Sequence, residues 1–302
     1  MLNPILSFSA TRRMRSFRTM LIVIAYEAAL LLLALLTMTP FLDGAVTLYS
    51  MERGPISYVL LVAAQFGLIA LITPAMTSGA IAGERERQTL DLLLVTNTGS
   101  FRIATGKILE SFALLALLII CGLPVTCLCL LTGGIGLGRI LLGTVFLLAE
   151  ALLCTTVGVF CSSLFRSTVV SAVISYLLML AIGVLTALPF LTGYPQQITN
   201  VVYDHQLYAA LTPGGARGMI SPFLYMNPAF GLTSLLQGQT HMLTGWIEGR
   251  GWGRLLCTWR MMDRAGCDTV TLLSAGGMMV LSAALTAATA FMIRRGGKRK
   301  AA

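Results

Sequence analysis

The sequence predicts an all-α membrane protein with six transmembrane helices, and three observations support this. The 302 residues are 56% hydrophobic and only 11% charged, whereas ordinary soluble proteins are about 25% charged. The mean hydropathy is +0.84. The apolar residues gather in runs of about 20 or more, the length that an α-helix needs to cross a bilayer. We therefore expect residues 1–302 to form a single transmembrane domain.

The six predicted spans lie between residues 20 and 293, the first five of them within 20–191. Their apolar runs cover Met20–Phe41, Ile56–Ile81, Ile108–Leu131, Ile140–Ser162, Val169–Leu191 and Thr269–Ile293. Lysine and arginine favour the cytoplasmic ends of spans, and most of the 21 such residues fall on the side of the N-terminus. This distribution predicts that both termini are cytoplasmic, with 294–302 as a basic tail. Arg260 and Arg264, close to the last span, run against the trend.

Residues 1–19 are predicted to form a helix along the cytoplasmic surface of the membrane. Asn3 can cap this helix, and Pro4 suits its first position. Apolar residues and four arginines follow, a composition that is typical of interfacial helices. A basic flank that only sets the topology has the same composition, so both alternatives stay open.

A strongly charged segment separates the second and third predicted spans. Glu84, Arg85, Glu86, Arg87 and Asp91 bring five charges into eight residues. Charges are costly in lipid, so this segment must lie in water. Leucines accompany the charges, and residues 84–95 therefore have the form of a short amphipathic helix. Such an element on a membrane protein predicts the docking of a partner.

The longest stretch outside the predicted spans is 192–268. Its four prolines exclude one long helix, and its apolar patch Phe223–Leu236 is too short to span, so we expect an interfacial or re-entrant piece there. All three tryptophans also lie in this stretch, together with five arginines. We expect short external helices before the sixth span, with 246–262 lying flat on the outer leaflet or across the mouth of the bundle. An ordinary solvated loop is the alternative.

No enzyme active site, metal site or nucleotide site is evident in the sequence. Gly106-Lys107 resembles the end of a P-loop, but Phe and Ile stand where that motif requires Gly and Ser/Thr. Neither histidine lies in a zinc-protease motif, and the Cys127-x-Cys129 pair has no histidine near it. We therefore expect no catalytic residue, no metal and no cofactor bound by this chain. The net charge of +9 arises at the ends of the spans, so nucleic-acid binding is not expected either.

Three acidic residues lie in or beside the predicted spans. Glu27 is roughly 10 Å into the first span at the helical rise, and Glu150 is near the middle of the fourth. Glu110 begins the third span and can pair with Lys107, one turn earlier. Acidic residues within a membrane are functional candidates by default, so Glu150 and Glu27 are candidate residues of a transport pathway. The alternative is that hydroxyl groups or an arginine simply satisfy each carboxylate.

These features carry a family resemblance. The run from Pro74 to Thr96, followed by Gly106-Lys107, closely resembles the ABC-2-type permease family. The opening Asn3-Pro4-Ile5-Leu6 and the pair Asn227-Pro228 before the last span are also similar to that family. The specific motif covers about 35 residues, and the six-span topology extends the resemblance to most of the chain.

The resemblance implies the permease subunit of an ATP-binding cassette transporter in a bacterial inner membrane, with export as the expected direction. Two permease subunits, identical or different, would form the pathway, and two separate ATPase subunits would bind ATP on the cytoplasmic side. The segment between spans two and three would be the coupling helix that contacts the ATPase. Its contact residues would be Glu84, Arg85, Glu86, Arg87, Gln88 and Thr89.

Two other classes of function stay open. An ion-coupled secondary transporter or channel could use Glu150 and Glu27 as ion sites and would need no ATPase. An inverted repeat would favour this class, and none is obvious in the sequence. A membrane-embedded enzyme would need a catalytic cluster, which the sequence does not provide.

Overall fold

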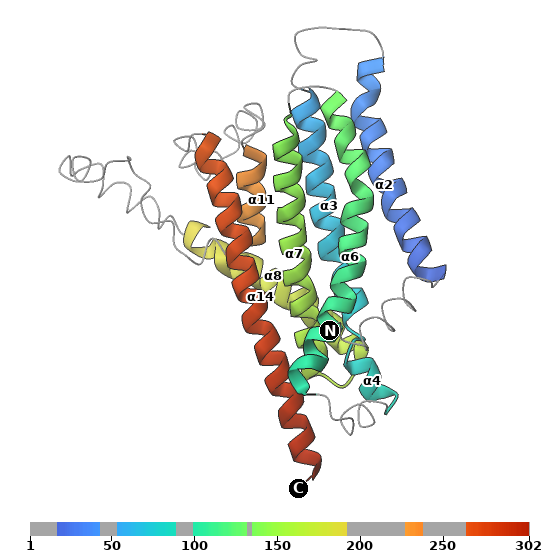
Figure 1. Ribbon diagram of the computed structural model, residues 1–302, viewed down its shortest axis with the longest axis vertical. Coiled ribbons are helices and arrows are strands. Elements are labelled where there is room, and N and C mark those ends of the chain that lie inside the picture. The colour runs from blue at the N-terminus through green and yellow to red at the C-terminus, as the bar shows by residue number, and fades with distance from the viewer. Residues whose placement is uncertain are drawn as a thin grey trace, which may run out of the picture. The chain divides into compact units, whose positions relative to one another are not determined.

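The computed structural model describes residues 17–42, 53–88, 99–131, 135–191, 227–237 and 264–301. All regular structure in these ranges is helical, which confirms the predicted all-α class (Figure 1). The helices are α2 (Phe17–Leu42), α3 (Arg53–Thr77), α4 (Ala82–Glu86), α6 (Ser100–Leu131), α7 (Leu137–Leu164), α8 (Thr168–Leu191), α11 (Pro228–Gln237) and α14 (Arg264–Ala301).

Five stretches of these helices are long and apolar enough to cross a membrane. They are Thr19–Thr37, Ser57–Glu86, Ser100–Leu131, Leu137–Leu164 and Thr271–Arg294. Each overlaps one of the predicted spans. The remaining predicted span corresponds to α8, whose described apolar stretch, Thr168–Val184, is shorter. The protein is therefore an integral membrane protein, while the fifth predicted span, and with it the total of six, stays a prediction.

The chain divides into two compact units, and the first comprises residues 1–179 and 279–302. In this unit α2, α3, α6 and α7 pack as a bundle, with α7 against α3, α6 and the short α4 (Figure 1). In the most apolar stretch of α7, 67% is buried inside the protein, compared with 22% in the corresponding stretch of α2. Thus α7 is the centre of this bundle, while α2 leaves leucines such as Leu32 and Leu36 exposed on its surface.

A glycine sets the distance between α3 and α7. A Cβ atom at Gly158 of α7 would overlap the side chain of Thr77 at the end of α3. Thr77 is held in place, because its hydroxyl group donates a hydrogen bond of 2.8 Å to the carbonyl oxygen of Thr73. Small residues let membrane helices approach closely, and here one of them brings the end of α3 directly onto α7.

The second unit, residues 180–278, is organised around Asn227. The Asn227 side-chain oxygen accepts a hydrogen bond from the Ala229 amide at 2.8 Å and so caps α11. Its side-chain nitrogen donates to the Gly183 carbonyl of α8 at 3.1 Å. The hydroxyl groups of Ser234 and Thr271 lie 2.8 Å apart and join α11 to α14. With 10 residues, α11 is too short to cross a bilayer, as predicted for the apolar patch around it.

Several predictions concern residues outside the described ranges. These are the interfacial helix over 1–19, of which only Phe17–Thr19 are described as the start of α2, and the external stretch 246–262. The segment 89–95 of the predicted coupling helix also lies outside the described part of the chain.

Candidate functional site

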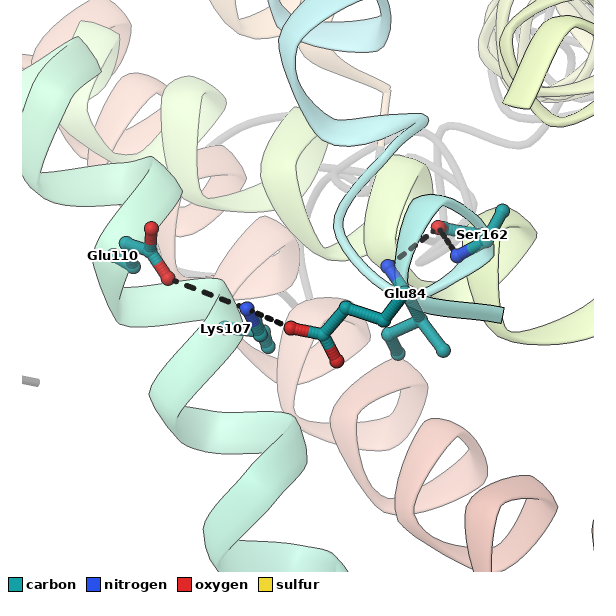
Figure 2. A network of polar contacts seen from close by, with 6 residues as sticks. Glu84, Lys107, Glu110 and Ser162 are labelled. Atoms are coloured by element: carbon teal, nitrogen blue, oxygen red, sulfur yellow. Dashed lines mark hydrogen bonds and ion pairs between the residues drawn. The ribbon is translucent and has the colours of Figure 1, made fainter. Parts of the chain in front are cut away.

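The first part of the candidate site is the turn between α3 and α4, which a single serine of α7 holds. The Ser162 hydroxyl oxygen accepts hydrogen bonds from the backbone amides of Ile81 and Ala82, each at 2.9 Å, as Figure 2 shows. The same hydroxyl group donates to the carbonyl oxygen of Ser78 at 2.7 Å. A hydroxyl group has one proton and two lone pairs, so this completely buried side chain uses its full bonding capacity on the turn.

An ion pair joins α4 to α6. The Lys107 ammonium nitrogen lies 2.6 Å from Glu84 Oε1 and 3.7 Å from Glu110 Oε2 (Figure 2). The second contact confirms the predicted pairing of Lys107 with Glu110. The shorter contact, with Glu84, was not predicted. Both Lys107 and Glu84 are about one-fifth exposed, so water screens their attraction only in part.

Two further contacts join α4 to the α7–α8 connection. Glu86 Oε1 accepts a hydrogen bond of 2.9 Å from the backbone amide of Thr168, the first residue of α8. The first amides of a helix lack partners within the helix and favour a negative charge, so this carboxylate suits the position. The Arg85 guanidinium donates to the carbonyl oxygen of Phe165, just past the end of α7, at 3.4 Å.

Apolar packing supports these polar contacts. Ala80 and Ile81 in the turn before α4 are buried against residues of α6, α7 and α14. The buried cluster consists of Ala80, Ile81, Ile103, Ala104, Ile108, Val159, Ala290 and Ile293. The turn is therefore inserted into the first unit, whereas the far end of α4 points outward, with Glu86, Arg87 and Gln88 exposed.

Within the described residues, the helix of the predicted coupling segment begins earlier than expected and is interrupted after Glu86, while 89–95 lie outside those residues. It was predicted over 84–95, whereas α4 covers Ala82–Glu86, and Arg87 and Gln88 form a turn. Gln88 adopts a φ of 58°, in the left-handed region that commonly ends helices but favours glycine. Of the six predicted contact residues, Glu84 and Arg85 are partly buried, Glu86, Arg87 and Gln88 are exposed, and Thr89 lies outside the described residues.

The two candidate pathway acids lie in one neighbourhood of the first unit. Glu150 of α7 is 1% exposed, and Glu27 of α2 is half-buried. Tyr26 interacts electrostatically with both carboxyl groups. Glu150 Oε2 and Glu27 Oε1 are buried without a hydrogen-bond partner among the described residues. In the alternative interpretation, hydroxyl groups or an arginine would satisfy both acids. No such partner bonds these two oxygen atoms among the described residues.

The fold and the site define an integral membrane protein whose helical bundle carries a short, charged helix at one end. Residues 9–292 match the family model described as ABC-2 family transporter protein. This match covers nearly the whole chain, so the chain belongs to the ABC-2 family and is a permease component of ATP-binding cassette transporters. Its family works with ABC ATPase subunits and has no nucleotide-binding domain of its own. None of the curated proteins compared matches this chain.

Proposed function

We propose that the protein forms a translocation pathway with a second permease subunit, and that two ATPase subunits drive transport through α4. In this proposal ATP binds only to the partner ATPases. The termini and α4 face the cytoplasm of a bacterial cell, and the transporter exports its substrate. The family match supports the partnership with an ATPase in general. The attachment of α4 supports its role as the coupling helix.

The observation that carries this proposal is the attachment of α4 to three helices at once, namely α6, α7 and α8. Ser162 connects the turn before α4 to α7, Lys107 connects Glu84 to α6, and Thr168 connects Glu86 to α8. A force on a single tether would rotate α4 about that contact. Three tethers instead make α4 move together with the ends of these helices, which is what a coupling element between an ATPase and a pathway requires.

The exposed end of α4 is the proposed docking surface, with Arg87 and Gln88 at its centre. Charge reversal at an interface typically weakens binding through like-charge contacts. We expect Arg87→Glu to weaken binding to the ATPase at least about tenfold, or about 1.4 kcal/mol. The measurement is co-purification and titration with the ATPase in nanodiscs.

The matched control is Arg294→Glu, which reverses another exposed arginine, on α14. This variant should bind the ATPase normally if α14 is not part of the docking surface. Normal binding and normal ATPase stimulation by Arg87→Glu would contradict the proposal.

A second candidate function is ion-coupled transport without an ATPase. The observation that favours it is the shared neighbourhood of Glu27, Tyr26 and Glu150. In this case purified protein in liposomes would transport in response to an ion gradient alone, and Glu150→Gln would abolish that transport. Strict dependence on ATP and on the ATPase would exclude this second function.

A further inference from the structure

A buried group of polar side chains lies inside the first unit, away from α4. We call Tyr26 of α2, Gln65 of α3 and Glu150 of α7 the interior polar cluster. All three are at most 3% exposed. Gly122 of α6 makes room for the cluster, because a Cβ atom there would lie 2.6 Å from the Gln65 side-chain nitrogen and 3.6 Å from the Tyr26 ring.

Among the described residues, none of the side chains found to interact with Glu150 is positively charged. Tyr26 on α2 interacts electrostatically with Glu150, and also with Glu27 on its own helix and Cys121 on α6. Cys154 lies one turn after Glu150 on α7 and interacts with it. Gln65 on α3 is neutral. An ionised carboxylate that has no counter-charge, and one oxygen atom without a hydrogen-bond partner, is very costly to bury. In this packed arrangement the neutral, protonated acid is therefore the stable form of Glu150.

A small, mainly apolar cavity lies between Gln65 of this cluster and the first turns of α7. Its volume is about 10 Å³, and its polar lining groups are Tyr58, Gln65, Thr126 and Thr144. A cavity of this size holds about one water molecule. The cavity also touches Ile140 and Gly143 in the first turns of α7. The Tyr58 hydroxyl donates to the Arg139 carbonyl oxygen at 3.0 Å, so polar groups continue to the beginning of α7.

Gln65 belongs to both the cavity and the interior polar cluster. One side of this residue lines the cavity, and its amide nitrogen lies where Gly122 leaves space beside Tyr26. The long glutamine side chain has several rotatable bonds, so its rotation would bring its amide group from the cavity towards Tyr26. Polar groups thus line a route from the start of α7 towards the middle of the bundle.

We propose that Glu150 is a proton-binding site in the membrane, reached from the α6–α7 end of the bundle through this cavity and past Gln65. On binding, a hydronium ion that has passed Gln65 and reached Glu150 loses one O–H bond, a new O–H bond forms on the Glu150 carboxylate, and a water molecule remains. Release of the proton reverses these steps when the bundle opens and water hydrates the carboxylate. This site does not rest on the proposed coupling to an ATPase.

The first experiment asks whether Glu150 carries a proton at neutral pH. Infrared spectroscopy of the wild-type protein in lipid should show the carbonyl band of a protonated carboxylic acid. Glu150→Gln should remove this band, while Glu27→Gln should retain it. Tyr26→Phe should shift the band without removing it. The absence of the band in the wild-type protein would overturn the proposal, and so would its persistence in folded Glu150→Gln.

If Glu150→Gln does not fold, Glu150→Asp provides the assignment. The aspartic acid band should then appear at a shifted position, and an unshifted band would overturn the assignment to residue 150.

The second experiment tests the route. In heavy water the acid exchanges its proton for deuterium, and the infrared band shifts. Gly143→Val should fill the cavity and slow this exchange several-fold. Leu141→Phe is the matched control, because it adds bulk to the same turn of α7 at a side chain that is 55% exposed, and it should exchange like the wild type. Equal exchange rates in Gly143→Val and the wild type would overturn the route.

Discussion

The α4 attachment and the interior polar cluster both bury polar side chains between several helices, but they differ in how these groups are paired. At α4 the Ser162 hydroxyl makes three hydrogen bonds, Lys107 lies between two carboxylates, and Glu86 binds the start of α8. In the neighbourhood of the cluster, Glu150 and Glu27 each have a buried oxygen atom without a hydrogen-bond partner among the described residues.

This difference separates a mechanical role from a chemical one. A buried hydroxyl group with three hydrogen bonds, such as that of Ser162, holds its elements in one arrangement, whereas an unsatisfied buried group is costly. Such a group is retained where it binds something. We therefore expect substitutions at the α4 attachment to change stability and coupling, and substitutions in the interior polar cluster to change proton binding with a smaller effect on stability.

The largest expected effect is that of Ser162→Ala. It removes the partner of two buried amides and one carbonyl, and each buried group without a partner costs about 1–3 kcal/mol. We expect a loss of about 2–5 kcal/mol in the free energy of unfolding, because little water can reach these buried groups to replace the lost hydroxyl group. Thermal unfolding and amide hydrogen exchange over residues 78–86 measure the effect.

The control is the neighbouring Ser163→Ala. Among the described residues, the Ser163 hydroxyl bonds only to the Phe160 carbonyl of its own helix, and so we expect a loss below about 1 kcal/mol. Equal losses in the two variants would show that the contact of α7 with the turn contributes little to stability. The α4 attachment would then not have the mechanical role that the comparison gives it.

The second effect compares one glycine from each region. Gly158→Ala would press a methyl group against Thr77, whose hydroxyl group is bonded to its own helix. Overpacking of this kind costs about 1–3 kcal/mol. Thr77→Ala in the same protein should relieve only part of the loss, because it removes the hydroxyl group but leaves the Thr77 Cβ atom 2.7 Å from the new methyl group. Gly122→Ala instead meets the end of the flexible Gln65 side chain, and should cost less while shifting the Glu150 infrared band. A similar loss of stability in Gly158→Ala and Gly122→Ala would contradict the expected difference between the two regions.

The third effect is the pairing energy of Glu84 with Lys107. A double-mutant cycle with Glu84→Gln and Lys107→Met should give a coupling of about 1 kcal/mol, because both groups are partly exposed. Salt should reduce the coupling. Each single variant should still bind the ATPase but stimulate it less. A coupling near zero, with normal stimulation, would mean that α4 moves independently of α6.

The smallest effect is expected at Gln88→Gly. Glycine adopts the left-handed backbone of this residue without strain, but it also increases the entropy of the unfolded chain. We expect a net stabilisation of about 0.5 kcal/mol, seen as slower amide exchange at the end of α4. Gln88→Ala is the control and should not stabilise. Equal stability of both variants would indicate that the positive φ of Gln88 does not strain the backbone.

Hydropathy predicts where the helices lie better than where they end. The third span was predicted from Ile108, whereas α6 begins at Ser100. Arg102 and Lys107 lower the hydropathy of this first part, although the helix continues through them. The same criterion placed the end of the second span at Ile81, whereas α3 ends at Thr77 and a turn follows. That turn contains apolar residues because it is buried in protein, and a hydropathy window does not distinguish this from lipid.

The pairing of site residues was predictable only where it is local. The contact of Lys107 with Glu110 follows from helical spacing. The contacts of Glu84 with Lys107, of Glu86 with Thr168 and of Ser162 with the turn join distant segments, and a serine in an apolar run has no feature that identifies its partner. Thr168 carried one signal, since a threonine after a short polar break is typical of a helix start. Glu150 was recognised because a carboxylate in an apolar run is costly wherever it packs.

The attachment by Ser162 also has a consequence for the order of assembly. Its partners, Ser78, Ile81 and Ala82, lie 80 or more positions earlier in the chain. During synthesis the α3–α4 turn is therefore made long before the hydroxyl group that completes it. Until α7 has entered the membrane, the two amides depend on water or on the insertion machinery for their hydrogen bonds. Arrival of α7 is thus the step that closes the turn and commits the first half of the protein to its final arrangement.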